Sequence, residues 1–283
     1  MKKAIKIIKS PYSGFCFGVE RAIKIAEGAI HKRKCVYSMG PIIHNPQVVR
    51  DLSKKGLRIA KNMKARPGKN LAVLIPSHGI EPKLLKGFKE VFDTTCPRVR
   101  RVQNIVKDLS KKGYFIFIVG KKDHPEVRSL AGIGGAATKV VKDAKEARSV
   151  YPKSKKVAVI SQTTSRESDF YEVLRELVKK NFLELAAFNT VCEDSIKRQS
   201  VAKAIAGRTD AMIVIGGRES SNTAKLASVC KGENKNTYHI ESANEVGRKM
   251  IKKRKKIGIA TGASTPPEAV RKTVERIRRL ERE

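Results

Sequence analysis

The sequence lacks tryptophan altogether, and aromatic residues make up only 5% of its 283 residues. Proteins that bind single-stranded nucleic acid stack bases on aromatic side chains, so this scarcity argues against a nucleic-acid partner. Long apolar runs are also absent: the strongest, residues 114–119, is far shorter than the roughly 20 residues that span a bilayer. The apolar stretch of MKKAIKIIKS at the amino terminus is too short for a signal peptide. We therefore expect a cytoplasmic protein with no membrane partner.

Closely spaced cysteine pairs are missing, although the chain has five cysteines. No two of them are separated by only two or three residues, which argues against a zinc ribbon or a two-cluster ferredoxin. In a reducing compartment, cysteines in this number indicate metal binding or catalysis rather than disulfides.

Acidic side chains are few relative to basic ones, 27 against 61, which gives a net charge of +34. Several interpretations of this charge remain open. It is typical of a solvated, lysine-rich surface, and equally of a protein that binds an anionic substrate, an acidic protein or nucleic acid.

What the sequence does contain is a threefold repeat, marked by Cys16, Cys96 and Cys192. Each of these cysteines opens an apolar-periodic segment, which predicts a helix. A glycine stands 24 residues after each cysteine, at Gly40, Gly120 and Gly216. A polar residue stands 28 residues after each cysteine, at His44, His124 and Ser220. A later strand-like run leads in each repeat to a third polar position, at His78, Thr163 and Ser264.

Each repeat of about 90 residues contains strands, polar turns and helices in alternation. Such alternation predicts parallel sheets, so the expected fold is α/β, with three pseudo-symmetric parallel-sheet units. We place the units at residues 14–95, 96–191 and 192–283, and the last is completed by residues 1–13. Ligands of parallel sheets bind beyond the carboxyl ends of the strands, where the polar positions fall. Three domains in a row without a shared site are the alternative.

If the three units pack around a threefold axis, their cysteines can converge. A thiol at a helix amino terminus is favoured as the thiolate, which is a ligand of zinc and of iron–sulfur clusters. Three thiolates on a four-iron cluster leave one iron open to substrate. An open three-thiolate zinc site and three buried packing residues remain as alternatives. Cys35 and Cys230 lie outside the repeat positions and are expected to pack.

Most of the other repeat positions carry uncharged polar side chains. Donors at turns and helix amino termini suit a phosphate or diphosphate. They are His44, His78, His124, Thr163, Thr164, Ser220, Ser221, Asn222 and Ser264. The alternative is structural: the serines and the asparagine can cap a helix, and each histidine can be an ordinary turn residue.

Glu126 lies two residues after His124, in the segment DHPE (residues 123–126), and it follows Pro125 in the first turn of a predicted helix. It can simply stabilise the helix terminus. If it faces a closed apolar cavity instead, its pKa rises and it can deliver protons. Thr163 or Thr164 could then relay them through a hydrogen bond.

Eight short motifs extend the argument: SGFCFGVERAI, PIIHNPQVV, PSHGI, DTTCP, KKDHPEV, SQTTS, ESSNT and TGASTP. In this order, over nearly the whole chain, they resemble the 4-hydroxy-3-methylbut-2-enyl diphosphate reductase family. The resemblance implies a trefoil of three α/β units around a central 4Fe-4S cluster. It implies an oxidoreductase of the non-mevalonate isoprenoid pathway that removes the allylic hydroxyl with two electrons and two protons. The products would be isopentenyl and dimethylallyl diphosphate.

The resemblance also implies a role for each repeat position. Three cysteines would hold one 4Fe-4S cluster with an open apical iron: Cys16, Cys96 and Cys192. The diphosphate would be held by His44, His78, Ser220, Ser221, Asn222 and Ser264, with His124 beside it. Glu126 would donate the proton, helped by Thr164 or, preferably, Thr163. A reduced ferredoxin or flavodoxin would supply the electrons.

The chain departs from the family pattern in two places. Glu193 and Asp194 follow the third repeat cysteine, where small or apolar residues are expected, and they add charge there. Pro76 and Ser77 precede His78, where an arginine is common. Two other functions stay open. A nucleic-acid-binding protein, such as an iron–sulfur RNA-modifying enzyme, would explain the charge but not the histidines and serines at the strand ends. The other is a non-enzymatic sensor of a phosphorylated ligand, built on the three units, which would bind a diphosphate without turnover.

Overall fold

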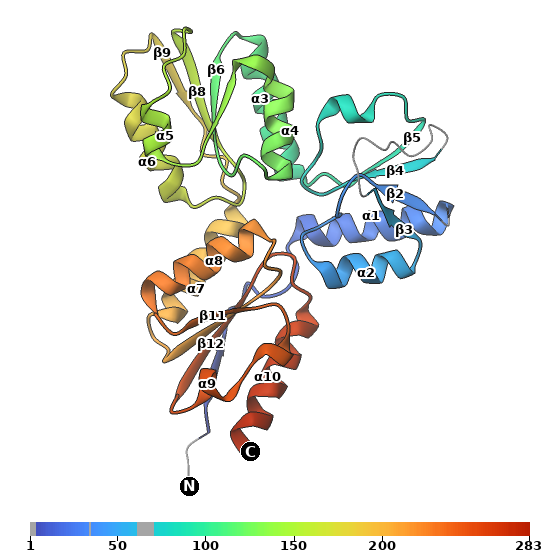
Figure 1. Cartoon of the computed structure of the whole chain (residues 1–283), viewed down its shortest axis with the longest axis vertical. Helices are drawn as coiled ribbons and strands as arrows, with labels where there is room; N and C mark the ends of the chain where they lie inside the picture. Colours follow the sequence, from blue (N-terminus) through green and yellow to red (C-terminus); the bar gives the residue numbers. More distant parts are fainter. Residues whose placement is uncertain (1–3, 34, 61–70) are drawn as a thin grey trace. The chain divides into compact units, whose positions relative to one another are not determined.

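The computed structural model describes residues 4–33, 35–60 and 71–283 (Figure 1). This part of the chain forms three four-stranded sheets, and every strand pair in them is parallel. The predicted α/β class with three parallel sheets is therefore confirmed. No helix among the described residues is long and apolar enough to cross a membrane.

The first sheet has the strand order β3-β2-β4-β5. Its strands are β2 (Val36–Ser38), β3 (Leu57–Ile59), β4 (Ala72–Ile75) and β5 (Glu90–Asp93). Its helical segments are α1 (Phe17–Arg33), α2 (Pro46–Lys54) and the 3-10 turn η1 (Pro82–Leu85).

The second sheet has the order β7-β6-β8-β9. Its strands are β6 (Phe115–Val119), β7 (Thr138–Val141), β8 (Lys156–Ser161) and β9 (Glu184–Ala187). Its helical segments are α3 (Pro97–Lys111), α4 (Pro125–Gly134), η2 (Gly135–Ala137), α5 (Ala144–Arg148) and α6 (Glu167–Val178).

The third sheet has the order β1-β12-β10-β11. Its strands are β1 (Lys6–Lys9), β10 (Ala211–Ile215), β11 (Thr237–Ile240) and β12 (Lys256–Thr261). Its helical segments are α7 (Glu193–Ala206), α8 (Ser221–Glu233), η3 (Ala243–Glu245), α9 (Arg248–Ile251) and α10 (Pro267–Arg282).

The three sheets share one topology. Read from the edge strand that comes second along the chain in each repeat, the orders β3-β2-β4-β5, β7-β6-β8-β9 and β11-β10-β12-β1 are the same. The amino-terminal strand β1 supplies the last position of the third sheet by pairing with β12. The repeat inferred from the cysteine spacing is thus a repeat of topology, whereas the predicted residue boundaries between the units stay a prediction.

By its internal contacts the chain divides into two compact units, which are described separately below. Unit 1 comprises residues 1–19, 44–48 and 193–283, and it contains the third sheet. Unit 2 comprises residues 20–43 and 49–192, and it contains the first and second sheets.

The central strands are mostly apolar and buried because helices cover both of their faces. In β6, Ile116 and Ile118 join the core under α3 and α4. Phe117 and Val119 point the other way and join the core under α5 and α6, as the two-residue period of a strand requires. Burying each such side chain stabilises the fold by about 2 kcal/mol. With both faces filled, the strand ends are the places left for polar loops.

Candidate active site

The three repeat cysteines occupy equivalent places in the fold. Each directly precedes a helix: Cys16 precedes α1, Cys96 precedes α3 and Cys192 precedes α7. The backbone N–H of each cysteine donates a hydrogen bond to a carbonyl two residues beyond the end of a central strand. These bonds run from Cys16 to Ala263 (3.0 Å), from Cys96 to Ser77 (2.8 Å) and from Cys192 to Thr163 (2.8 Å). The cysteines therefore lie at the carboxyl ends of the sheets, the same ends at which the sequence predicts the polar positions.

A second hydrogen bond recurs two residues before each cysteine. The residue at that position bonds to the last residue of the same central strand. The bonds are Thr94 Oγ1 to the Ile75 carbonyl (2.5 Å), Thr190 Oγ1 to the Ser161 carbonyl (2.5 Å) and Gly14 N–H to Thr261 Oγ1 (2.9 Å). We call this pair of bonds the cysteine anchor. None of the three repeat cysteines forms a disulfide, and all three are half-buried, which suits side chains that bind a metal group.

The remaining two cysteines are placed differently. Cys230 lies in α8, within a core cluster, and burial raises the pKa of its thiol to about 12. Cys35 directly precedes β2, at the amino end of that strand. Neither residue has a cysteine anchor.

Glu126 is a buried carboxyl, with only 2% of the residue exposed. Burial raises its pKa to about 7, although two hydrogen bonds from Thr163 oppose the shift. The Thr163 N–H donates to Oε1 at 2.7 Å, and the Thr163 hydroxyl donates to Oε2 at 2.8 Å. Since the Thr163 carbonyl also accepts from the Cys192 N–H, one residue joins the acid to the loop of a repeat cysteine.

His124 is the amino-terminal cap of α4. Its Nδ1 accepts a hydrogen bond from the Glu126 N–H at 3.2 Å, which places the proton of the neutral ring on Nε2. His78 lies next to it, with ring centroids 6.4 Å apart in an edge-on arrangement. Both histidines are buried, so unit 2 gathers two imidazoles and a carboxyl in one place.

A polar network fixes the loop that carries His78. Gln103 on α3 donates to the Ser129 hydroxyl at 3.0 Å, and Ser129 donates to the Ile80 carbonyl at 2.8 Å. The intervening Gly79 has a φ of +75°, and the Gln103 side chain fills the space that a Cβ would take. A side chain at position 79 would therefore displace the network and the histidine before it.

Unit 1 gathers the other predicted positions. The Asn45 side chain donates to the Ser264 carbonyl at 2.8 Å, and the Ser264 hydroxyl donates to the His44 carbonyl at 3.2 Å. Burial lowers the pKa of His44, and the nearby Glu219 opposes this shift. His44 is thus favoured as the neutral ring.

Ser220 and Asn222 lie at the amino terminus of α8. Ser220 caps the helix, because its hydroxyl accepts from the Thr223 N–H at 3.3 Å, and Ser221 is the first helical residue. Asn222 is 7% exposed and accepts from the Ser195 hydroxyl at 3.3 Å. Its Nδ2 is buried without a hydrogen-bond partner among the described residues. A buried, unsatisfied donor at a helix amino terminus is a place for an anion.

The structure corrects one predicted equivalence between the repeats by one residue, at the third polar position. Counted from the strand ends and the cysteine anchors, Thr163 corresponds to Ser77 and Ala263. Thr164 is therefore the counterpart of His78 and Ser264. Thr164 accepts a hydrogen bond from Gln162 Nε2 at 2.8 Å. The sequence missed this register because the loops before the third position differ in length.

The predicted positions fall in both compact units. Unit 1 holds Cys16, His44, Ser220, Ser221, Asn222 and Ser264. Unit 2 holds Cys96, Cys192, His78, His124, Glu126, Thr163 and Thr164. Among the described residues of the chain, no three His, Cys, Asp or Glu side chains form a metal-binding group, so the convergence of the cysteines stays a prediction.

The two acidic residues after Cys192 are both paired. Glu193 forms an ion pair with Lys197 at 2.8 Å, and Asp194 forms one with Arg198 at 2.7 Å. The charge by which this segment departs from the family pattern is therefore compensated within α7 itself.

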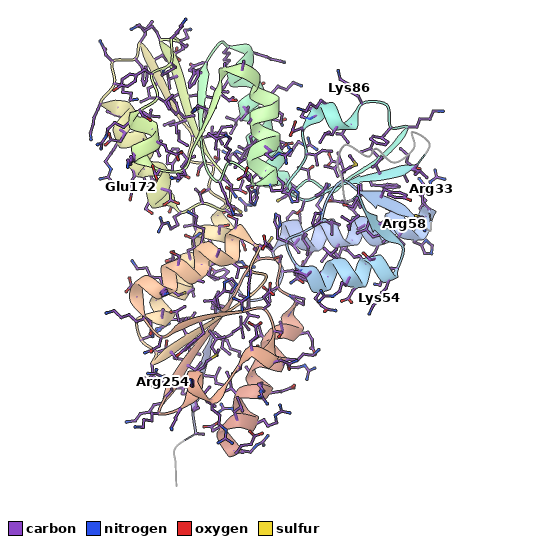
Figure 2. The ribbon with its side chains drawn as sticks, viewed as in Figure 1. Arg33, Lys54, Arg58, Lys86, Glu172 and Arg254 are labelled. Carbon is purple, nitrogen blue, oxygen red and sulfur yellow. The ribbon has the colours of Figure 1, made fainter. Side chains whose placement is uncertain are left out.

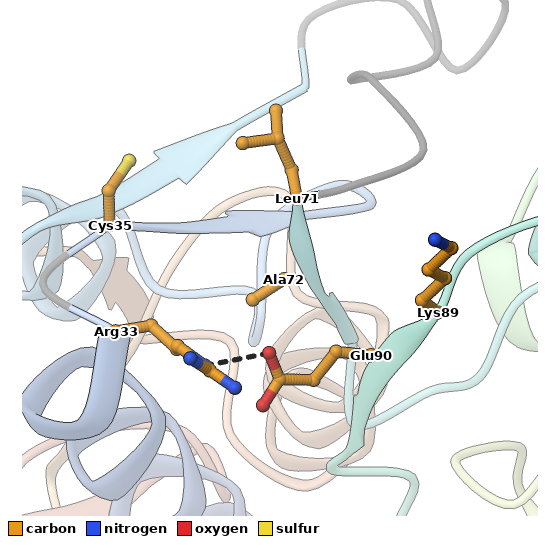
Figure 3. Close-up of a pocket in the computed structure, with 6 residues that line it drawn as sticks. All are labelled: Arg33, Cys35, Leu71, Ala72, Lys89 and Glu90. Atoms are coloured by element: carbon orange, nitrogen blue, oxygen red, sulfur yellow. Dashed lines mark ion pairs between the residues drawn. The ribbon is translucent and has the colours of Figure 1, made fainter.

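A pocket of about 520 Å³ lies elsewhere, in unit 2 (Figure 3). It is lined by Arg33, Cys35, Leu71, Ala72, Lys89 and Glu90, and Arg33 pairs with Glu90 across it at 2.7 Å. These residues lie at the amino ends of β2, β4 and β5. Since the polar positions lie at the carboxyl ends, this pocket is separate from the candidate site.

The basic side chains are mostly at the surface. In Figure 2, Lys54 and Lys86 extend away from the ribbon, and both are exposed. In unit 2, Glu126, His78, His124 and Thr163 are instead buried. The net charge is carried mainly by exposed side chains, and none of the predicted site positions is a lysine or arginine.

Fold and site together define a class: an α/β protein of three topologically equal parallel sheets, with one anchored cysteine at the carboxyl end of each. The sequence profile of the LytB protein family matches residues 7–278. The chain belongs to the LytB family.

Named relatives agree with this assignment. A 4-hydroxy-3-methylbut-2-enyl diphosphate reductase of Caldanaerobacter subterraneus subsp. tengcongensis is 43% identical over 99% of both chains. The reductase of that name from Aquifex aeolicus is 38% identical over 98% of this chain and 97% of its own.

Two solved structures are also similar. One is an (E)-4-hydroxy-3-methyl-but-2-enyl diphosphate reductase, the terminal enzyme of the non-mevalonate pathway, with 38% identity and a TM-score of 0.68. It covers 98% of this chain and 100% of its own. The other is E-1-hydroxy-2-methyl-but-2-enyl-4-diphosphate reductase of Plasmodium falciparum, with 27% identity and a TM-score of 0.89, covering 96% and 87%.

Proposed function

We propose that this chain is an iron–sulfur oxidoreductase that removes the allylic hydroxyl of 4-hydroxy-3-methylbut-2-enyl diphosphate. Two electrons and two protons convert the substrate to water and to isopentenyl or dimethylallyl diphosphate. Membership of the LytB family supports the substrate and the reaction type. The observation that carries the proposal is the buried carboxyl of Glu126, bonded to a threonine that also anchors a repeat cysteine.

Cys16, Cys96 and Cys192 would hold a 4Fe-4S cluster. The donor set fits: three half-buried thiols, none of them in a disulfide, have the same backbone anchor at equivalent strand ends. Three cysteines leave one position open. When bound, such a cluster supplies electrons and a Lewis-acidic iron for the substrate oxygen.

The diphosphate would be bound by neutral donors. His44, His78, Ser220, Ser221, Asn222 and Ser264 would form the cage, with His124 beside it. The unsatisfied Asn222 Nδ2 supports this assignment, because a phosphate oxygen would give it an acceptor. The α8 amino terminus adds backbone N–H groups and the positive end of the helix dipole. A cage of neutral donors stabilises the anion without long, mobile side chains.

Glu126 would deliver the proton to the leaving hydroxyl. A carboxyl with a pKa of about 7 is protonated in part at neutral pH, which suits a general acid. A protonated Glu126 can donate to the Thr163 hydroxyl, which can rotate and donate onward. Thr163 would be the relay, and Thr164 would line the site as the counterpart of His78.

Electrons would come from reduced ferredoxin or flavodoxin, both acidic proteins in general. The net charge of +34 supports an acidic partner and an anionic substrate.

The test is turnover by the anaerobically reconstituted chain, with reduced viologen as donor and mass spectrometry of the products. Cys16→Ser, Cys96→Ser and Cys192→Ser should each lose the cluster and the activity. Cys35→Ser, which lacks the anchor, is the matched control and should retain both. Equal tolerance of all four substitutions, or no turnover by the wild type that binds a cluster, would overturn the proposal.

A further inference from the structure

Two arginines connect the helix that follows one repeat cysteine to the loop that leads to the next. Arg198 lies on α7, six residues after Cys192, and its Nη1 donates to the Tyr12 carbonyl at 2.5 Å. Tyr12 lies in the loop that ends at Cys16. Arg21 lies on α1, five residues after Cys16, and its Nη1 donates to the Thr95 carbonyl at 3.1 Å.

The position of the acceptors is informative. Thr95 directly precedes Cys96, and Tyr12 is four residues before Cys16. The loop with Tyr12 is already held at Gly14 and Cys16 through the cysteine anchor. Arg198 adds a further hydrogen bond to this loop, from the helix that follows Cys192. Such a contact adds nothing to helix or sheet, but it restricts the backbone that presents the thiol.

Arg198 is unusual among the basic residues. Of the 61 lysines and arginines of the chain, it alone is buried among the residues that the structure describes, at 4% exposure. Its Nε is bonded to Asp194 Oδ2 at 2.7 Å, which supplies the compensating charge that a buried cation requires. The guanidinium group therefore donates two hydrogen bonds, one to the Asp194 carboxylate and one to the Tyr12 backbone carbonyl.

We propose that Arg21 and Arg198, the bridging arginines, are positioning residues for the cluster-binding cysteines. Each arginine fixes the loop of one cysteine, Arg198 that of Cys16 and Arg21 that of Cys96. Asp194, which departs from the family pattern, orients Arg198 in the protein interior through their hydrogen-bonded ion pair. This inference rests on the proposed function only in taking the cysteines as cluster ligands. That the arginines hold the loops before these cysteines rests on the hydrogen bonds alone.

The experiment measures thiol reactivity in the cluster-free protein. Each cysteine is alkylated with iodoacetamide over a time course and quantified by mass spectrometry of its peptide. Arg198→Met should accelerate alkylation of Cys16 by roughly tenfold, the effect of losing one hydrogen bond to a charged group, and leave Cys96 unchanged. Arg21→Met should show the reverse selectivity. The buried Cys230 reports unfolding, because it reacts only when the core opens.

Matched controls come from the same helices. Lys197 neighbours Arg198 on α7 but pairs with the exposed Glu193, and Lys24 is an exposed residue one turn along α1 from Arg21. Lys197→Met and Lys24→Met should leave both cysteines as in the wild type. If Arg198→Met unfolds because Asp194 loses its partner, Arg198→Met with Asp194→Asn removes both charges and keeps the test open.

The reconstituted protein gives a second readout. Both arginine variants should lose iron to a chelator faster than the wild type, and Arg198→Lys should recover part of this loss, since a lysine reaches one acceptor but not both. The inference would be overturned if Cys16 and Cys96 were alkylated at wild-type rates in the folded arginine variants. It would also be overturned if each variant accelerated the alkylation of Cys16 and Cys96 equally. A wild type that takes up no iron would count against the proposed function alone, because the alkylation pattern does not depend on the cluster.

Discussion

In the proposed reaction Glu126 would donate the proton, and its environment suits that role. Burial penalises the carboxylate more than the two hydrogen bonds from Thr163 stabilise it, so the pKa rises to about 7. A surface glutamate in the first turn of a helix would instead keep an ordinary or lowered pKa. The sequence predicted Glu126 at that helix start. It left open whether the carboxyl stabilises the helix or donates a proton, because burial depends on tertiary packing.

Replacing Glu126 by glutamine should retain substrate binding and reduce turnover by at least about a hundredfold, a typical loss for a general acid. The amide keeps the shape of the side chain and its oxygen can still accept from the Thr163 N–H, but it has no acidic proton to transfer to the leaving hydroxyl. Steady-state kinetics and a binding isotherm for the diphosphate separate the two effects. An unchanged kcat would remove the acid role.

The same residue predicts how stability depends on pH. Since the folded pKa lies above the ordinary value of 4.5, the folded state binds the proton more tightly than the unfolded state. The free energy of unfolding should therefore fall as pH rises from about 4.5 to about 7, by roughly 3 kcal/mol from this group. Urea unfolding at a series of pH values measures it. In Glu126→Gln this fall should be absent, and a pH profile equal to that of the wild type would contradict the assignment.

At the scale of elements, the cysteine anchor joins each loop to the end of a central strand. Thr94 bonds through its side chain to the Ile75 carbonyl, and Thr190 bonds to Ser161 in the same way. Gly14 achieves the equivalent bond with its backbone N–H. The loop that leads to Cys16 differs from the other two because its threonine, Thr261, is the last residue of strand β12 and not a residue of the loop.

Thr94→Val should weaken the anchor of Cys96. The lost hydroxyl should lower the free energy of unfolding by about 1 kcal/mol and speed the release of iron to a chelator. Thr138→Val removes a similar bond, from the hydroxyl to the Gly135 carbonyl at 2.7 Å, at a site without a cysteine. It should lower stability without changing iron release, and equal iron release in the two variants would contradict the role of the anchor.

Sequence patterns predicted these elements to different degrees. The apolar run of β6 and the cysteines before α1, α3 and α7 followed from periodicity and spacing. The register of Thr163 against His78 did not, because loop lengths vary between repeats. No sequence pattern indicated the bridging arginines either. An arginine that bonds to a backbone carbonyl requires no particular residue type at the position of that carbonyl.

At the scale of the whole molecule, the dominant feature is the charge of +34. Arg198 is the only lysine or arginine that is buried among the described residues, and none of the predicted site positions is a lysine or arginine. Charge of this kind acts at long range, on the rate of encounter rather than on the chemistry.

Salt should therefore slow the reaction with an acidic electron donor. With flavodoxin as donor, kcat/KM should fall several-fold as ionic strength rises, because the Debye length shrinks from about 10 Å at 0.1 M to about 3 Å at 1 M. Reduced methyl viologen, a cation, is the matched control and should not be slowed. The same salt dependence with both donors would show that the surface charge does not steer the partner.

The central claim is that three cysteines, one from each repeat, hold one four-iron cluster with an iron open to the substrate. Mössbauer spectroscopy of the chain reconstituted with ⁵⁷Fe, with and without 4-hydroxy-3-methylbut-2-enyl diphosphate, tests it most directly. We predict one iron site distinct from the other three, whose isomer shift changes when the diphosphate is added. Four equivalent irons that do not respond to the diphosphate, or iron retained after Cys16→Ser, Cys96→Ser or Cys192→Ser, would contradict it.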